Sequence, residues 1–238
     1  MRLVRLAAVA AALSLGVSST ATAQWTYPHT FQFQGGSGVY FNGQQVGTYK
    51  GSLDGGQQIS VWCTDFYNPS HSGAVNSYVT VLGGTDLSKT RFGGVAGAAA
   101  MYQKAAYLTT LFATSATSQW GYIQYAIWQL FNAPAPNTGS AFPAAQTHID
   151  SYLALAQANY RNYYYNNFRI ITDATVVNGN SRWPNGCQNL PGRTCGFQEY
   201  IEGNLTPVPE PATMGLLALG LVGLGVASAR RRRNSQSN

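Results

Sequence analysis

The chain has 238 residues, of which only 9% are charged, and it is rich in glycine (26) and tyrosine (15). Its formal net charge of +6 is misleading, because Arg2, Arg5 and the four arginines at 230–233 supply six of the 14 basic residues. The middle of the chain is therefore near neutral, which excludes the clustered positive field that nucleic-acid binding requires. A turn-rich chain of low charge suits an exported surface protein better than a cytosolic enzyme.

Residues 1–23 have the three-part layout of a secretory signal peptide. Arg2 and Arg5 precede an apolar run at 6–17, and small residues follow up to Ala23. We expect cleavage near Gln24, with the domain folding outside the inner membrane; an uncleaved anchor is the alternative. Disulfides are permitted in that compartment.

Short β-favouring runs alternate with Gly, Asn and Asp between residues 27 and 82. They predict strands at 27–33, 38–41, 59–66 and 78–82. Side chains alternate between the two faces of a strand, so Cys63 is expected to face the same layer as Ile59 and Val61.

The pattern then becomes helical. An Ala-rich segment at 95–113 has apolar residues at helical spacing, and the run at 120–131 is apolar on nearly every side, which predicts a buried helix. Prolines in the segment 133–139 end that helix, and Pro143 suits the first turn of a third one.

The β pattern returns at 168–177 and again near 197–201. The order of strands, helices and strands predicts an α+β domain at 24–205. We expect an antiparallel β-sandwich or barrel-like unit with an inserted block of about three helices. Cys187 and Cys195 bracket a Gly/Pro/Asn loop and are expected to form a disulfide.

The C-terminal end carries three elements in order. Pro209, Glu210 and Pro211 end a linker at 206–211, an uncharged apolar run occupies 212–229, and the basic tail at 230–238 opens with Arg230, Arg231, Arg232 and Arg233. The apolar run is just long enough to cross a bilayer as a helix, with the arginines on the cytoplasmic side.

This combination resembles the PEP-CTERM sorting signal of Gram-negative bacteria that make exopolysaccharide. The resemblance implies processing by an exosortase, which is a membrane cysteine transpeptidase, and delivery to the cell surface or extracellular matrix. The inner membrane and the exosortase are then the expected partners. A plain single-span anchor is the alternative.

Three internal segments carry a second resemblance: VWCTDF at 61–66, KAAYL at 104–108 and YIQYAIW at 122–128. Together they resemble the bacterial thioester domain of surface adhesins, which has an aromatic-Cys motif and, after a helix, a hydrophobic-Gln-x-Ala-Ile-Trp motif. In that family the Cys thiol and the Gln side chain condense into an internal thioester with loss of ammonia. By position, those residues are Cys63 and Gln124.

The thioester would need its sulfur and carbonyl carbon held at about 3–3.5 Å before reaction. Burial raises the pKa of a thiol, so a base or donors to the oxyanion would be needed, and Asp65, His71 and Tyr125 are the candidates. Trp120 and Trp128 are expected to screen the bond from water. Ordinary roles in turns, loops and core packing are the alternatives for all five, as is an inert buried thiol for Cys63.

Three functions remain open. The first is one-shot covalent capture of a surface protein or polysaccharide through Cys63 and Gln124, which is not an enzyme activity and needs no cofactor. The second is a noncovalent structural or matrix-interaction module of the exopolysaccharide layer that binds through residues such as 163–167. The third, a cysteine hydrolase using Cys63 with His29, His71 or His148, lacks a local signature. Metal-ligand spacing is also missing.

Overall fold

The computed structural model describes residues 28–84, 86–131, 142–177, 196–204 and 206–207. Within these residues, six antiparallel strands close into a barrel in the order β1-β4-β5-β9-β8-β6, and β6 pairs with β1. The strands are β1 (His29–Gly35), β4 (Tyr49–Leu53), β5 (Gln58–Cys63), β6 (Ala74–Val81), β8 (Arg169–Asp173) and β9 (Tyr200–Glu202). Two short pairs lie outside the barrel: β2 (Tyr40–Phe41) with β3 (Gln44–Gln45), and β7 (Tyr163–Tyr164) with β10 (Thr206–Pro207).

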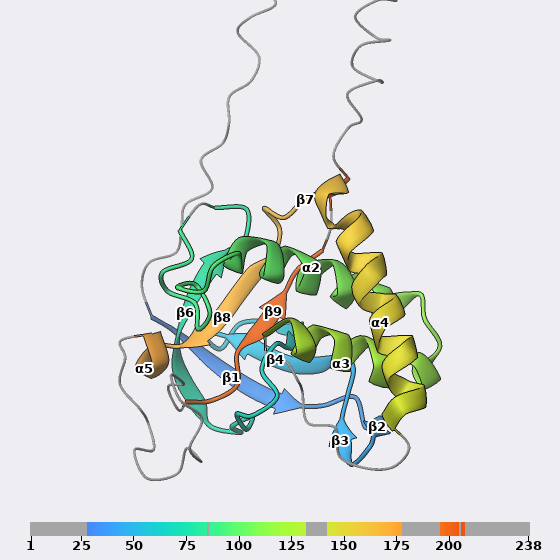
Figure 1. Ribbon diagram of the computed structural model, residues 1–238. Helices are drawn as coiled ribbons and strands as arrows, with labels where there is room; N and C mark the ends of the chain where they lie inside the picture. Colours follow the sequence, from blue (N-terminus) through green and yellow to red (C-terminus); the bar gives the residue numbers. More distant parts are fainter. Residues whose placement is uncertain (1–27, 85, 132–141, 178–195, 205, 208–238) are drawn as a thin grey trace, which may run out of the picture.

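Three helices enter the chain between β6 and β8 and lie together on one side of the barrel (Figure 1). They are α2 (Ala98–Thr110), α3 (Trp120–Phe131) and α4 (Phe142–Asn159), and a short α5 (Ala174–Val177) follows β8. α3 contacts both other long helices and the strand β5. The prediction of an α+β domain with an inserted helical block is therefore confirmed for the described residues.

The interior of the barrel near β5 is aromatic. Tyr49 pairs with Val61 and Cys63 pairs with Tyr200, so these four side chains face the same side of the sheet. All four are buried. Trp62 lies on the opposite face and stacks on Phe112, with ring centroids 6.4 Å apart. Cys63 and Val61 thus share a face, as the alternation of the sequence predicts.

Two predicted strands end earlier than expected, and an aspartate turns the chain at or just after the end of each. β5 stops at Cys63 because Asp65 accepts a hydrogen bond from the backbone N–H of Tyr67 and turns the chain. β8 stops at Asp173, which accepts from the backbone N–H of Thr175 and starts α5.

The sequence analysis misses β4, although this strand lies between β1 and β5. Its sequence, YKGSL, has neither apolar alternation nor an apolar run. The ring of Phe31 from β1 explains the glycine, since a Cβ on Gly51 would lie 2.5 Å from that ring. Packing of an aromatic side chain on bare backbone leaves no hydrophobic signal in the strand itself.

Several predictions fall outside the described residues. They concern the signal peptide at 1–23, the Cys187–Cys195 disulfide, the spanning helix at 212–229 and the basic tail at 230–238. Among the described helices, none combines the length and hydrophobicity that a membrane crossing requires. The domain boundaries likewise stay predictions.

Candidate functional site

The side chain of Gln124 reaches from the middle of α3 to the end of β5. Its Nε2 donates a 2.8 Å hydrogen bond to the backbone carbonyl of Cys63, and both residues are completely buried. A few covalent bonds separate this carbonyl from the Cys63 thiol. Folding therefore brings a carboxamide and a thiol from distant parts of the chain into one enclosed region.

The carboxamide is only partly satisfied there. Gln124 Oε1 is buried and has no hydrogen-bond partner among the residues that the structure describes. Leaving a buried polar group unpaired costs about 1–3 kcal/mol. The fold thus buries, next to Cys63, the side-chain carbonyl of Gln124 without a hydrogen-bond partner among the described residues.

The Cys63 thiol is embedded in the barrel interior. Burial raises its pKa well above the ordinary 9.0, a hydrogen bond with the Tyr49 side chain opposes that shift, and the negative charge of Asp65 raises the pKa further. The thiol is consequently protonated at neutral pH. The Tyr49 hydroxyl donates a 2.5 Å hydrogen bond to the Gln45 backbone carbonyl and is also within hydrogen-bonding reach of the Cys63 thiol. No pattern in the sequence points to Tyr49, because it lies on the unpredicted strand β4.

The contacts of Asp65 give it a structural role. Its carboxylate pairs with the guanidinium of Arg91, with Nε and Oδ2 3.1 Å apart, and also accepts hydrogen bonds from the backbone of Tyr67 and the side chain of Asn68. These contacts fit the turn-forming alternative better than a base. Asp65 instead acts on Cys63 through its charge.

A second buried carboxylate, Glu199, lies directly before β9. It accepts hydrogen bonds from the hydroxyls of Tyr102 (2.6 Å) and Thr172 (2.5 Å) and from the backbone N–H of Arg91 (2.7 Å). Burial raises the Glu199 pKa, which the Arg91 charge and these hydrogen bonds oppose. Thr64, next to Cys63, contributes a longer hydrogen bond of 3.3 Å. Sequence analysis misses this cluster because its members come from five separate segments.

The predicted aromatic residues divide into two groups. Trp128 is 3% exposed and packs edge-on against Phe66 (4.9 Å between ring centroids) and Tyr125 (5.0 Å). Tyr125 is fully buried, and burial raises its pKa. Trp120 instead packs against Phe112, and its Nε1 donates to the backbone carbonyl of Ser115. Trp128 and Tyr125 thus belong to the aromatic layer beneath Phe66, whereas Trp120 packs with Phe112.

A groove of about 310 Å³ lies over this aromatic layer. The β2–β3 hairpin supplies one wall and the loop at 66–70 supplies the other, with Tyr49 and Trp128 also lining it. Three of the lining residues, Tyr49, Trp128 and Gln198, are buried. Tyr49 neighbours Cys63, and Trp128 packs on Phe66. We refer to this feature below as the aromatic groove.

The three histidines have partners of their own. His29 contacts Asp54 at 2.6 Å, and His148 stacks on Tyr122 with ring centroids 4.7 Å apart. His71 lies flat against Phe197, with ring centroids 4.2 Å apart. The hydrolase hypothesis therefore has no support from any of these contacts.

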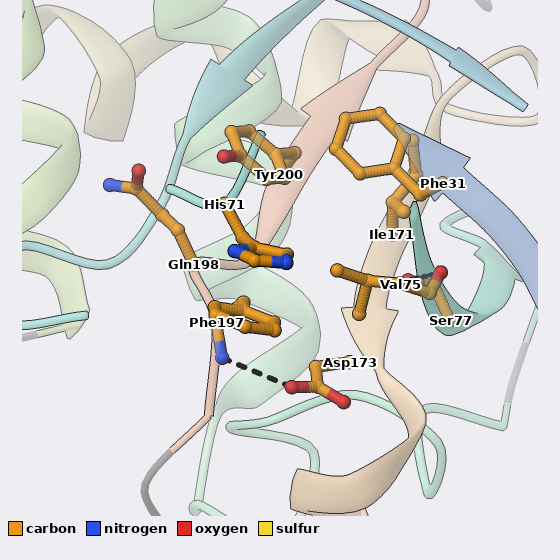
Figure 2. Close-up of a pocket in the computed structure, with 9 residues that line it drawn as sticks. All are labelled: Phe31, His71, Val75, Ser77, Ile171, Asp173, Phe197, Gln198 and Tyr200. Atoms are coloured by element: carbon orange, nitrogen blue, oxygen red, sulfur yellow. Dashed lines mark hydrogen bonds between the residues drawn. The ribbon is translucent and has the colours of Figure 1, made fainter. Parts of the chain in front are cut away.

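His71 lines a small cavity of about 10 Å³ that also contains Ser77 and Asp173 (Figure 2). Ser77 donates its hydroxyl to the carbonyl of Val75, and Asp173 accepts from the backbone N–H of Phe197 at 3.0 Å. The Ser77 hydrogen bond lies within β6, Asp173 holds the chain at Phe197, and the space is about one water molecule in size. Within the described residues, no group of three or more His, Cys, Asp and Glu side chains is arranged to hold a metal.

Comparisons with known proteins agree with the C-terminal prediction. No curated protein matches the chain. A solved structure, the N-terminal domain of the Streptococcus pyogenes pilus tip adhesin Cpa, is weakly similar: the TM-score is 0.38 at 14% identity, covering 78% of this chain and 97% of the other. A family model for the PEP-CTERM protein-sorting motif matches residues 207–233. The chain thus carries a PEP-CTERM protein-sorting motif, which directs export, C-terminal membrane anchoring and exosortase-dependent sorting to the cell surface.

Proposed function

We propose that the exported domain attaches covalently to a nucleophile on a partner surface through an internal thioester between Cys63 and Gln124. The observation that carries the proposal is the buried hydrogen bond from Gln124 Nε2 to the Cys63 carbonyl. The sorting motif supplies the setting, since a one-shot crosslink is useful to a protein displayed at the surface of a cell. A Gram-negative host belongs to the same proposal.

The reaction is a condensation without redox change. The Cys63 sulfur attacks the Gln124 side-chain carbonyl carbon, the new S–C bond forms, and the C–N bond of the carboxamide breaks. The thiol proton leaves with the nitrogen as ammonia. Tertiary packing of α3 on β5 makes the step intramolecular, which lowers the barrier that a free thiol and amide would face.

Two features of the site favour this product. The hydrogen bond between the Cys63 and Tyr49 side chains opposes the rise in the Cys63 pKa that burial causes. The unpartnered Oε1 of Gln124 also favours the change, because a thioester oxygen is a weaker hydrogen-bond acceptor than an amide oxygen and loses less by being buried.

The finished bond would be held away from water until a partner arrives. Cys63 and Gln124 are both completely buried, and the Trp128 and Tyr125 rings pack next to each other beside Phe66. An amine or hydroxyl of the partner then attacks the carbonyl carbon, forms an amide or ester with Gln124 and releases the Cys63 thiol. No cofactor is needed for either step.

Intact mass spectrometry of the exported domain tests the proposal. Wild-type protein is expected to be lighter than its sequence mass by one ammonia, and Cys63→Ala and Gln124→Ala are expected to have their full sequence masses. Gln129→Ala is a matched control, because Gln129 is also on α3 but pairs with Gln146. The Gln129 variant should keep the deficit.

A wild-type domain with its full sequence mass and a free thiol contradicts the proposal. The noncovalent matrix module is then the better account, and the raised pKa of the buried Cys63 thiol is the observation that favours it. The surface at 163–167, which is predicted to bind partners in the noncovalent module, is only partly exposed. Tyr164 is exposed, but Tyr165 is buried and donates its hydroxyl to the Tyr160 carbonyl.

A further inference from the structure

The aromatic groove has an unusual lining for a protein surface. Among the residues that the structure describes, ten line it, and none of these ten is Asp, Glu, Lys, Arg or His. Four carry side-chain amides: Gln44, Gln45, Asn68 and Gln198. Four are aromatic: Tyr49, Phe66, Tyr67 and Trp128. The groove thus combines flat apolar rings with groups that both donate and accept hydrogen bonds.

From this chemistry we infer that the aromatic groove binds a neutral saccharide. Sugar rings present an apolar C–H face, which packs on an aromatic ring, and hydroxyls at their edges, which pair with amides. The missing charges disfavour both a lysine-rich peptide and an acidic glycan, since neither would find a counter-charge in the lining. The volume of about 310 Å³ lies at the lower end of the range for small-molecule sites, and suits one or two sugar units.

The stacking surface is exposed where a glycan would meet it. Tyr67 is 41% exposed at the groove, and its ring packs edge-on against Phe66, with centroids 5.4 Å apart. Phe66 in turn rests on Trp128. The exposed ring is therefore backed by a fixed aromatic layer.

The wall formed by residues 66–70 is held rigid. Asp65 accepts from the backbone N–H of Tyr67, and Ser70 donates its hydroxyl to Gln198 Oε1 at 2.7 Å. Gln198 also joins the loop through its backbone N–H, which donates to the Pro69 carbonyl at 3.1 Å. A preformed wall reduces the entropy that a ligand must overcome on binding.

The groove shares one residue with the surroundings of Cys63, and covalent capture of a bound glycan rests on the proposed thioester. Tyr49 lines the groove and hydrogen-bonds the Cys63 side chain. A sugar hydroxyl would attack the Gln124 carbonyl carbon, the new O–C bond would form as the S–C bond breaks, and the hydroxyl proton would pass to the Cys63 sulfur. The product is an ester between the saccharide and Gln124.

Calorimetric titration with linear glucose, mannose and galactose hexasaccharides tests the binding. The experiment uses the exported domain with Cys63→Ala, so that binding is measured without a thioester. At least one neutral hexasaccharide is expected to bind, with a galacturonate hexasaccharide and a lysine hexapeptide binding more weakly. Tyr67→Ala should weaken neutral binding by about tenfold, the loss expected for one stacked ring.

Two further variants separate stacking from general damage. Tyr67→Phe keeps the ring and should retain most of the affinity. Tyr164→Ala removes a comparably exposed tyrosine, 49% exposed on β7, and should bind as the parent does. Failure of all neutral hexasaccharides to bind, or equal affinity of the Tyr67→Ala protein, overturns the inference.

The covalent step is read separately from the mass of wild-type protein after incubation with the bound hexasaccharide. An adduct that is absent with Cys63→Ala supports both ideas. Binding without a thioester mass deficit removes the proposed function and leaves the saccharide site. A mass deficit of one ammonia without saccharide binding supports the thioester and overturns the saccharide site.

Discussion

Arg91 connects two of the buried carboxylates that the structure describes, Asp65 and Glu199. Its guanidinium pairs with Asp65 at the end of β5, and its backbone N–H donates to Glu199 before β9. Buried charges of this kind are stable only when their partners stay in place. The cluster therefore fixes the chain directly after Cys63, since the backbone N–H of Thr64 also donates to the Glu199 backbone carbonyl.

Glu199→Gln is expected to change how stability depends on pH. The folded state raises the Glu199 pKa above its ordinary value of 4.5. Below 4.5 the residue is protonated whether the chain is folded or not, and its stabilising contribution is fully present. The contribution is lost as pH rises through the folded pKa, because the unfolded chain releases the proton more readily. Urea unfolding from pH 4 to 8 measures the difference between variant and wild type.

That difference isolates Glu199 from the other groups of the cluster. Arg91, Asp65 and Tyr102 are present in both proteins, so the substituted carboxyl group is the only difference between them. The wild type should lose stability relative to the variant as pH rises. Two stability curves that run parallel across this range would show that the Glu199 pKa is not raised.

At the scale of elements, α3 organises the helical block and is also the element best anticipated from sequence. Its bounds, Trp120–Phe131, are those of the predicted run, because an apolar helix gives an unambiguous pattern. β4 is the contrasting case, since its place between β1 and β5 depends on ring packing over Gly51. A local hydrophobic pattern predicts an element when the side chains of that element are themselves apolar and buried.

Gly121→Ala should weaken the contact between α3 and the β2–β3 hairpin. A Cβ on Gly121 would lie 2.1 Å from the Phe41 ring carbon that is bonded to its own Cβ, which cannot move away cheaply. Overpacking of this kind costs about 1–3 kcal/mol. Gly94→Ala is the matched control, because its added Cβ meets no atom within 4 Å.

Thermal and urea unfolding of both glycine variants provide the measurement. Phe41 packs on Tyr122 and Tyr125 of α3, so a displaced hairpin should also disturb the aromatic groove that it borders. Equal stability of the Gly121 and Gly94 variants would mean that the hairpin moves to accommodate the added methyl group without loss of stability.

At the scale of the whole molecule, the barrel and the sorting motif are separate in sequence and separable by experiment. Removal of residues 207–233 should abolish surface sorting because the matched motif is lost. Removal of residues 234–238 alone leaves the motif intact and should preserve sorting. An epitope placed after residue 24 and cell fractionation with surface protease treatment follow the protein in each case. Surface display that survives loss of 207–233 would assign sorting to another segment.

The sorting motif, the helical block and the alternation that turns Cys63 inward can all be predicted from the order of the amino acids. Each is a contiguous or periodic pattern, and such patterns are readable because neighbouring residues carry all of the information. The resemblance also singled out Cys63 and Gln124 as a pair. Their hydrogen bond, however, is a contact across 61 residues.

The residues that surround Cys63 and Gln124 are brought there by the tertiary fold. Pairing of β4 with β5 brings Tyr49 to the thiol, Arg91 links Glu199 to Asp65, and the fold sets the β2–β3 hairpin opposite residues 66–70 to form the aromatic groove. These contacts join segments that lie far apart in the chain. Hydrogen bonds and ring packing between such segments depend on spatial proximity, which no local pattern of side chains encodes.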